Sequence, residues 1–188
     1  MKNRSKIILM LAILIASTSC IKTQLETTYN KQEDQIDQYI TKNMVVKNAE
    51  GGSDTLRVVR NAGSNRLVKK EGIGVELAKD GYVSFYYAGY VFNGGSISPS
   101  NLFITNKKEW ASEAGWDTEE SEYILYEISL KDADLIPGLK SGLEGVKAGE
   151  ECEILFSAKY GFENKPIGII PAKTALAYKI TVVGVTND

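Results

Sequence analysis

The sequence contains no histidine and only two cysteines, Cys20 and Cys152. Without an imidazole, no Ser–His or Cys–His nucleophile pair can form, and the usual nitrogen ligands of zinc are missing. Two thiols are also too few for a multi-thiolate metal site. The composition therefore excludes much of proton-transfer and metal-dependent enzyme chemistry, and we expect no metal and no cofactor.

The chain also lacks a strong excess of charge of either sign. It has 22 basic and 24 acidic residues among 188, and its basic residues never run longer than the lysine pairs at 69–70 and 107–108. Nucleic-acid binding needs clustered basic side chains that replace phosphate counterions. We therefore expect no nucleic-acid partner. The acidic residues within 117–122 lack the spacing of a calcium loop, and we interpret them as a solvated loop.

The apolar run near the N-terminus is too short for a permanent membrane span. Residues 7–16 (IILMLAILIA) are ten apolar positions, whereas a transmembrane helix needs about 20. Basic residues precede this run, and the small residues 17–19 (STS) and then Cys20 follow it. This order is typical of an export signal. Residues 1–19 are therefore predicted to be a signal peptide.

The position of Cys20 resembles a bacterial lipoprotein signal, in which the cysteine is lipidated and becomes the new N-terminus. The family usually has a larger aliphatic residue where this chain has Ser17. The resemblance implies a lipid anchor at Cys20, and the alternative is an ordinary secretory signal with an incidental cysteine. Lipoproteins of Bacteroidetes on the outer face are associated with an acidic cluster beside the cysteine. Residues 21–24 (IKTQ) have none, so we expect an outer membrane protein of the bacterial cell envelope that faces the periplasm.

Residues 20–45 are predicted to form a lipid-anchored polar tether followed by a short amphipathic helix over about 31–43. Asn30 and Glu33 suit the first turn of such a helix, since a short polar side chain caps its N–H groups and a carboxylate suits its positive end. Its apolar residues recur at helical spacing on one face. They are Ile36, Tyr39, Ile40 and Met44. We expect this face to dock on the domain, or alternatively to bind a partner.

From residue 46 to 188 the pattern is that of one antiparallel β domain with a short core helix, which makes the fold class α+β. In the strand predicted over 82–92, Val83, Phe85 and Tyr87 share one face because side chains alternate across a sheet. In the strand over 151–157, Cys152, Ile154 and Phe156 should point inward. Further strands are predicted over 56–59, 74–77, 122–130 and 175–185, a turn over 61–65, and a helix over 137–146.

Five segments resemble, in family order, the motifs of FKBP-type peptidyl-prolyl isomerases. They are FYYAG at 85–89, LIPGLKSGL at 135–143, VKAGE at 146–150, YG at 160–161 and IIPAKTALAY at 169–178. The resemblance implies an FKBP-like antiparallel sheet curled around one short helix, with an N-terminal amphipathic helix. It also marks residues 99–122 as an insertion, because family members have a much shorter connection there.

The resemblance implies a pocket that binds proline and carries the catalytic contacts. Family precedent places the hydrogen-bond donors at the Ile136 backbone N–H and the Tyr160 hydroxyl. The chain departs from the family at Leu139, where a tryptophan normally forms the pocket floor, and at residues 97–99 (ISP), where an aromatic residue and a carboxylate are lost. The approach to Tyr160 is also two residues shorter. The implied catalytic residues are Tyr87, Ile136, Tyr160 and Tyr178, and the implied substrate-binding residues are Tyr126, Leu135, Leu139, Ile170 and Ile97.

Prolyl isomerisation needs no histidine, metal or nucleophile, because it breaks no covalent bond and transfers no proton. The sequence therefore predicts a membrane-anchored isomerase or folding helper that binds proline-containing segments of exported proteins. The alternative is a catalytically degenerate FKBP-fold lipoprotein that binds a protein or peptide. In that case the insertion, with Trp110 and Trp116, would be the contact surface.

Overall fold

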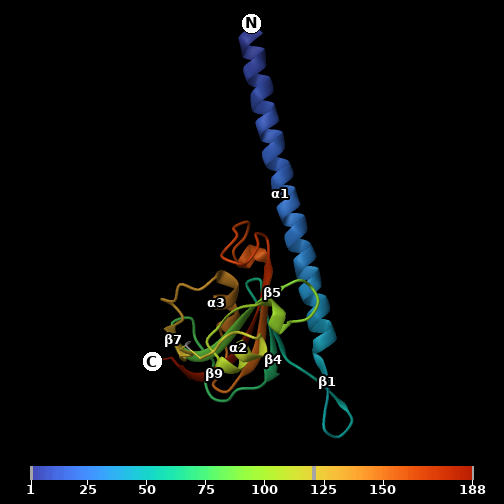
Figure 1. The fold of residues 1–188 in the computed structure, drawn as a ribbon. Helices are drawn as coiled ribbons and strands as arrows, with labels where there is room; N and C mark the ends of the chain where they lie inside the picture. The colour runs from blue at the N-terminus through green and yellow to red at the C-terminus, as the bar shows by residue number, and fades with distance from the viewer. Residues whose placement is uncertain (1, 120–121, 188) are drawn as a thin grey trace.

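The computed structural model describes residues 2–119 and 122–187, and it describes side chains from residue 22 onward. Its body is a curved seven-stranded antiparallel sheet with spatial order β3-β4-β8-β9-β5-β6, in which β7 also pairs with β5 (Figure 1). The strands are β3 (Val58–Asn61), β4 (Ser64–Lys70), β5 (Tyr82–Phe92), β6 (Leu102–Thr105), β7 (Tyr126–Ser129), β8 (Glu151–Phe156) and β9 (Ala175–Thr186). The architecture confirms the predicted α+β class, an antiparallel sheet curled around one short helix with a helix at the N-terminus.

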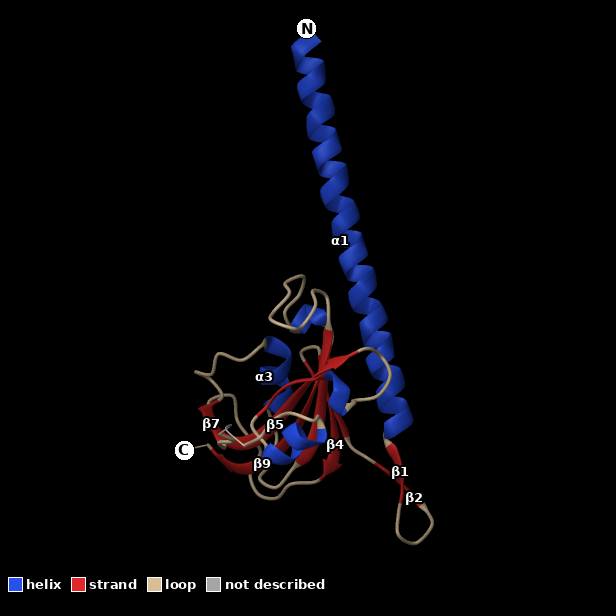
Figure 2. Cartoon of the chain, in the orientation of Figure 1, coloured by secondary structure: helices blue, strands red, loops and turns tan. Residues whose placement is uncertain are grey.

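Helices lie on both faces of this sheet, and a separate two-stranded hairpin follows the C-terminal end of α1 (Figure 2). The helices are α1 (Lys2–Asn43), α2 (Lys108–Glu113) and α3 (Pro137–Leu143), with the 3₁₀ turns η1 (Pro99–Asn101) and η2 (Ala158–Tyr160). The hairpin is β1 (Val45–Lys47) and β2 (Ser53–Thr55).

Strand β5 pairs with three other strands, more than any other strand of the sheet. One edge pairs along its whole length with β9, and the other pairs with β7 over Tyr82–Phe85 and with β6 over Ala88–Tyr90. Val83, Phe85 and Tyr87 contribute to the same core cluster, as the alternation predicted. The inner face of the sheet is therefore set by the odd-numbered residues of this strand.

Helix α3 lies across the inner face, close to β8. Two of its glycines make this close approach possible, since a Cβ at Gly138 would overlap the ring of Phe156 and one at Gly142 would overlap Ile154. Cys152, Ile154 and Phe156 all point into this core, as predicted. The remaining buried members of the cluster are Leu77, Val83, Phe85, Leu130, Leu139, Leu143, Val146, Ile170, Leu176, Tyr178, Ile180 and Val182.

A buried arginine lies at the C-terminal end of α3. The Arg66 guanidinium donates from Nη1 to the carbonyl oxygens of Gly142 and Glu144, both at 2.7 Å. Its Nε lies 3.1 Å from Oε1 of Glu150, whose side chain is fully buried, and Nη2 of Arg57 lies 3.5 Å from the other oxygen. Burial raises the pKa of Glu150, an effect that the two neighbouring guanidinium groups oppose.

The N-terminal helix is longer than predicted. The helix expected over 31–43 is the C-terminal part of α1, and residues 22–30, expected as a tether, are helical as well. These residues include no glycine or proline that would end a helix, and Asn30 lies within α1 rather than capping it. Among the residues described with side chains, no helix is long and apolar enough to span a membrane.

The C-terminal part of α1 docks on the outer face of the sheet, which confirms the predicted docking. Ile36 and Ile40 are almost fully buried there, against Phe92 and Leu155 among others. The Tyr39 hydroxyl donates a hydrogen bond to Oε2 of Glu153 at 2.9 Å.

Gln32 extends this interface toward the loops beside the sheet. It donates to the carbonyl oxygen of Lys173 at 2.7 Å and accepts from the amide of Ala158 at 2.9 Å. Apolar packing and specific hydrogen bonds therefore both hold the helix against the domain.

Three predicted strands and the predicted helix differ from the structure. The strand predicted over 56–59 lies two residues later, at Val58–Asn61, and the helix predicted over 137–146 ends at Leu143. Residues 74–77 are not a strand, since Gly74 has a positive φ of 81° and Leu77 hydrogen-bonds to the turn after α3 instead. The strand predicted over 122–130 is shorter, with β7 only at Tyr126–Ser129. The turn predicted over 61–65 is confirmed at its centre, where Ala62 and Gly63 both have positive φ between β3 and β4.

We predict that Arg66→Met lowers the free energy of unfolding by about 3–5 kcal/mol at pH 7, because it leaves a buried carboxylate without its main partner. The loss should be smaller near pH 4. A carboxyl whose folded-state pKa lies above the unfolded value of about 4.3 destabilises the fold as pH rises through that interval. Urea denaturation at both pH values measures this. The matched control is Lys70→Met, which removes an exposed pair with Glu151 and should cost no more than about 0.5 kcal/mol.

Candidate functional site

A cleft of about 300 Å³ opens on the inner face of the sheet, at the N-terminal end of α3. Strands β5, β6, β7 and β9, the segment that leads into α3 and the loop after η2 contribute its walls. The lining residues are Phe85, Tyr87, Ile104, Tyr126, Asp134, Leu135, Ile136, Leu139, Phe162 and Tyr178. The lining is thus almost entirely aromatic or aliphatic, which is typical of a site that desolvates its ligand.

The aromatic side chains of this cleft support one another through edge contacts. The ring of Tyr126 meets Phe85 at a centroid distance of 5.5 Å and Tyr87 at 5.8 Å, both in T-shaped geometry. On the opposite side, Tyr178 stacks on Phe156 at 6.0 Å and meets the edge of Phe103 at 5.9 Å. These contacts fix the rings, since T-shaped and offset stacked pairs are the favoured arrangements.

Burial raises the pKa of the Tyr178 hydroxyl, and the neighbouring Tyr87 adds to the rise. Burial, with a further contribution from Tyr126, likewise raises the pKa of Tyr87. Both phenols therefore stay neutral at physiological pH. The cleft offers neutral hydroxyls and an apolar surface rather than a charged catalyst.

The amide of Ile136 is a backbone donor beside the cleft. Ile136 precedes the first turn of α3, and its carbonyl oxygen accepts from the amide of Lys140 at 3.0 Å. Within the described part of the chain, the Ile136 N–H donates to no other group. It can therefore donate to a carbonyl oxygen of a bound polypeptide.

Six of the nine residues that the FKBP resemblance implied for the pocket line this cleft. They are Tyr87, Tyr126, Leu135, Ile136, Leu139 and Tyr178. Tyr160, Ile170 and Ile97 do not.

Tyr160 lies at the end of η2, on the side of the domain that faces α1. Its ring packs directly on the backbone of Gly63, where a Cβ would overlap it. It borders a separate hollow of about 690 Å³ together with Tyr29 and Glu33 of the helix. Tyr160 also packs against the inner core cluster, but it is not among the residues that line the cleft, where the resemblance had placed it.

Ile170 and Ile97 have structural positions. Ile170 is 5% exposed in the core and exchanges two backbone hydrogen bonds with Ile167. Ile97 packs on the outer face of the sheet, between the cluster beneath α1 and the cluster beside α2. Ile170 belongs to the same core cluster as Leu139 and Tyr178, but neither it nor Ile97 lines the cleft.

Sequence reasoning missed Phe85, Ile104, Asp134 and Phe162 as lining residues. Phe85 could have been found, because it shares a strand face with Tyr87. Ile104 lies in the insertion, and its position depends on how β6 pairs with β5. No local signal in the sequence predicts that pairing.

The described residues of the insertion, 99–119 and 122, border the cleft but do not fill it. Strand β6 brings Ile104 to one side, while α2 packs on the outer face, where Trp110 contacts the cluster of Ala88, Tyr90 and Leu102. The Nζ of Lys107 lies 4.7 Å from the centroid of the Trp110 ring. The tryptophan therefore serves mainly to pack the insertion against the sheet.

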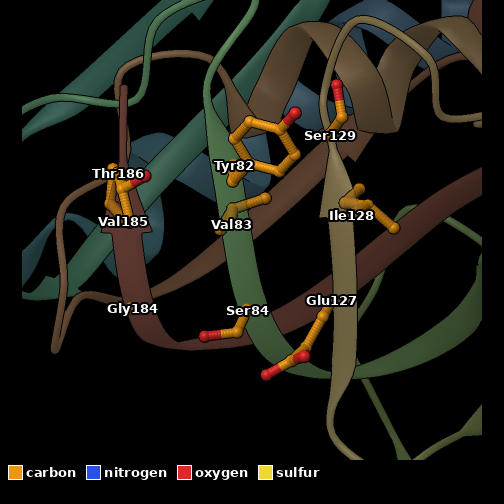
Figure 3. A pocket seen from close by; sticks show the side chains of 9 residues that line it. All are labelled: Tyr82, Val83, Ser84, Glu127, Ile128, Ser129, Gly184, Val185 and Thr186. Atoms are coloured by element: carbon orange, nitrogen blue, oxygen red, sulfur yellow. The ribbon is translucent and has the colours of Figure 1, made fainter. Parts of the chain in front are cut away.

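A second hollow, of about 480 Å³, lies where the ends of β5, β7 and β9 meet (Figure 3). Cross-strand pairs lie side by side there, Tyr82 with Ser129 and Ser84 with Glu127. Its lining lacks the group of mutually packed rings found in the cleft. The cleft is therefore the better candidate for a ligand site.

No group of three or more potential metal-ligating side chains occurs among the described residues. Cys152 is buried with a free thiol, and burial raises its pKa, as expected for a core residue. Cys20 lies outside the residues whose side chains are described.

Comparison with known families identifies the class of protein. Residues 75–183 match the family described as FKBP-type peptidyl-prolyl cis-trans isomerase. The match covers more than half of the chain and includes the whole cleft. The chain therefore belongs to the FKBP-type peptidyl-prolyl isomerase family. Among curated protein sequences, none matches the chain.

Solved structures share this fold at low sequence identity. FkpA from Escherichia coli is 16% identical with a TM-score of 0.51, and the match covers 94% of this chain and 70% of that one. A peptidyl-prolyl cis-trans isomerase from Pseudomonas syringae pv. tomato is 15% identical with a TM-score of 0.55, covering 86% and 96%. The N-terminal domain of FKBP42 from Arabidopsis thaliana is 16% identical with a TM-score of 0.52, covering 70% and 93%.

We predict that Gly138→Ala lowers the free energy of unfolding by about 1–3 kcal/mol, because the added methyl group pushes α3 away from Phe156. Ser141→Ala in the same helix adds no atom and should change stability by less than about 0.5 kcal/mol. Chemical denaturation of both variants measures the difference. Equal stabilities would show that α3 is not packed as tightly as described.

Proposed function

We propose that the protein is a membrane-anchored peptidyl-prolyl cis-trans isomerase that assists the folding of exported proteins. The observation that carries the catalytic part is the open aromatic cleft, which has the Ile136 N–H at its edge and which the described residues of the insertion leave uncovered. Membership of the isomerase family supports the same activity.

The chemistry of prolyl isomerisation suits such a cleft. The barrier of about 18–20 kcal/mol comes from amide resonance, and unassisted X-Pro bonds interconvert over tens to hundreds of seconds. The twisted amide of the transition state has a less polarised carbonyl group than the planar amide. The twisted amide therefore loses less solvation free energy than the planar amide does when an apolar cleft excludes water.

Each wall of the cleft has a role in this proposal. Tyr87, Tyr126 and Tyr178 enclose the proline ring, and Leu139 forms the floor beneath it. The Ile136 N–H donates to a carbonyl oxygen next to the rotating bond. No group needs to gain or lose a proton, which agrees with the neutral state of Tyr87 and Tyr178.

A second candidate is a binding module that has the fold without useful catalysis. The observation that favours it is the position of Tyr160 outside the cleft, since the family places a donor hydroxyl at that residue. Leu139 in place of tryptophan also offers less aromatic surface to a proline ring. Both candidates bind proline-containing segments, and they differ in turnover.

We predict that the mature protein accelerates cis–trans exchange of a peptide with one Leu-Pro bond, and that Tyr87→Ala reduces kcat/KM at least about tenfold. The large ring forms part of the cleft wall, and a lost contact of about 1–3 kcal/mol corresponds to such a factor. Tyr160→Phe should change kcat/KM by less than about twofold, because the hydroxyl lies outside the cleft. A protease-coupled assay measures all three rates.

The assay separates the two candidates. If micromolar protein binds the peptide but leaves its exchange rate equal to the uncatalysed rate, the isomerase candidate is rejected and the binding module is supported. A large loss in Tyr160→Phe would instead indicate that the η2 loop moves its hydroxyl to the substrate.

We infer the cell envelope as the location, with a lipid anchor at Cys20 and the domain facing the periplasm. The support is the order of basic, apolar and small residues before this cysteine, and the absence of acidic residues at 21–24. Acyl chains on that cysteine would hold the protein at a membrane without a transmembrane helix.

We predict that Cys20→Ala releases the protein from the membrane fraction into the soluble fraction of the bacterial envelope. Fractionation, together with labelling by a fatty-acid analogue, measures both the location and the modification. The matched control is Cys152→Ala, which removes the buried thiol and should leave the protein acylated and membrane-bound. Membrane association of Cys20→Ala equal to that of the wild type would overturn the anchor.

A further inference from the structure

Strands β6 and β7 pair with the same edge of β5, and the backbone pairing along this edge is interrupted between them. Strand β7 pairs with this edge as far as Phe85, and β6 pairs with it from Ala88 onward. Tyr86 and Tyr87 lie between these pairings. Backbone groups left unpaired at this point would weaken the strand where it carries a cleft residue.

The side chain of Asn106 occupies this interruption. Its Oδ1 accepts from the amide of Tyr87 at 2.6 Å, and its Nδ2 donates to the carbonyl oxygens of Phe85 at 3.2 Å and Ile124 at 2.9 Å. Its own backbone amide donates to the carbonyl oxygen of Tyr87 at 3.2 Å. Thr105 adds a hydrogen bond from Oγ1 to the same Tyr87 oxygen at 2.7 Å.

These bonds join the two strands that carry the aromatic wall. Tyr87 lies on β5, and Ile124 is two residues before Tyr126 on β7. The rings of Tyr87 and Tyr126 meet 5.8 Å apart in the cleft. A single amide group therefore joins the backbone of Tyr87 to the segment that leads into Tyr126.

We propose that Asn106 is a positioning residue for the cleft, one that holds Tyr87 and Tyr126 at the spacing that binds a proline ring. This proposal rests on the cleft being the ligand site of the proposed function. Asn106 is not itself among the residues that line the cleft, so it acts through the two tyrosines.

The chemistry of the amide explains why asparagine suits this place. A carboxamide has two N–H donors and one acceptor oxygen, and here they meet two carbonyl groups and one amide N–H. An aspartate at this position would retain the acceptor for Tyr87 but lose both donors. An alanine would lose all three side-chain bonds and leave the backbone of Phe85, Tyr87 and Ile124 without them.

The test compares Asn106→Ala with Asn187→Ala. Asn187 is a matched control because its side chain also bridges two backbone groups, accepting from Ala78 at 2.9 Å and donating to Glu76 at 2.8 Å. It does not line the cleft. Both variants should therefore lose similar stability, which thermal unfolding measures, and only one should change the ligand site.

For Asn106→Ala we expect about tenfold weaker binding of a Leu-Pro tetrapeptide by calorimetry and a matching fall in kcat/KM, because small displacements of positioned groups have large effects. The NMR signals of the Tyr87 and Tyr126 rings should shift, since the two rings no longer lie edge to face. Asn106→Asp should fall between alanine and wild type. Asn187→Ala should leave the peptide affinity and both ring signals unchanged.

The readouts separate this proposal from the proposed function. If the wild type binds the peptide without turning it over, the isomerase proposal fails, and weaker binding in Asn106→Ala still supports the positioning role. If the wild type neither binds the peptide nor turns it over, the NMR signals of the Tyr87 and Tyr126 rings alone test the positioning role of Asn106. Peptide affinity and ring signals in Asn106→Ala equal to those of Asn187→Ala would overturn the role of Asn106.

Discussion

The fold depends on the buried interaction of Arg66 with the C-terminal end of α3 and with Glu150. The guanidinium satisfies two carbonyl groups that the short helix leaves unpaired and balances a carboxylate that has no access to water. It thereby links β4, α3 and the start of β8. The cleft lies at the other end of α3, so the position of Ile136 and Leu139 relative to the sheet follows from this contact.

The two faces of the sheet are covered by different elements, and this explains how the domain accommodates both α1 and the insertion. The inner face carries α3 and the aromatic cleft, whereas α1 and α2 both cover the outer face. The insertion passes beside Tyr87, yet its Leu102, Trp110 and Ala114 pack on the outer face. A long insertion at the margin of the cleft is therefore compatible with an open ligand site.

The sequence predicted the elements whose pattern is local. Alternation identified the inner faces of β5 and β8, and the Pro-Gly start of α3 marked the central helix. The resemblance to family motifs correctly predicted six of the residues that line the cleft. The position of Tyr160 could not be predicted from local pattern, because its ring packs on Gly63, which is distant in sequence. Asn106 escaped notice for a similar reason, since its side chain replaces a strand partner only after β6 and β7 have paired with β5.

The docking of α1 through Gln32, Tyr39 and the apolar residues beside them has a mechanical consequence. A flexible tether of ten residues would let a domain explore a radius of roughly 18 Å about its attachment point. A helix fixed to the sheet instead behaves as a strut, and residues 22–31 alone extend it by about 15 Å (Figure 1). On a membrane surface, such a strut would hold the cleft at one height and one orientation. Only those substrate segments that pass the membrane surface at this height would then reach the cleft.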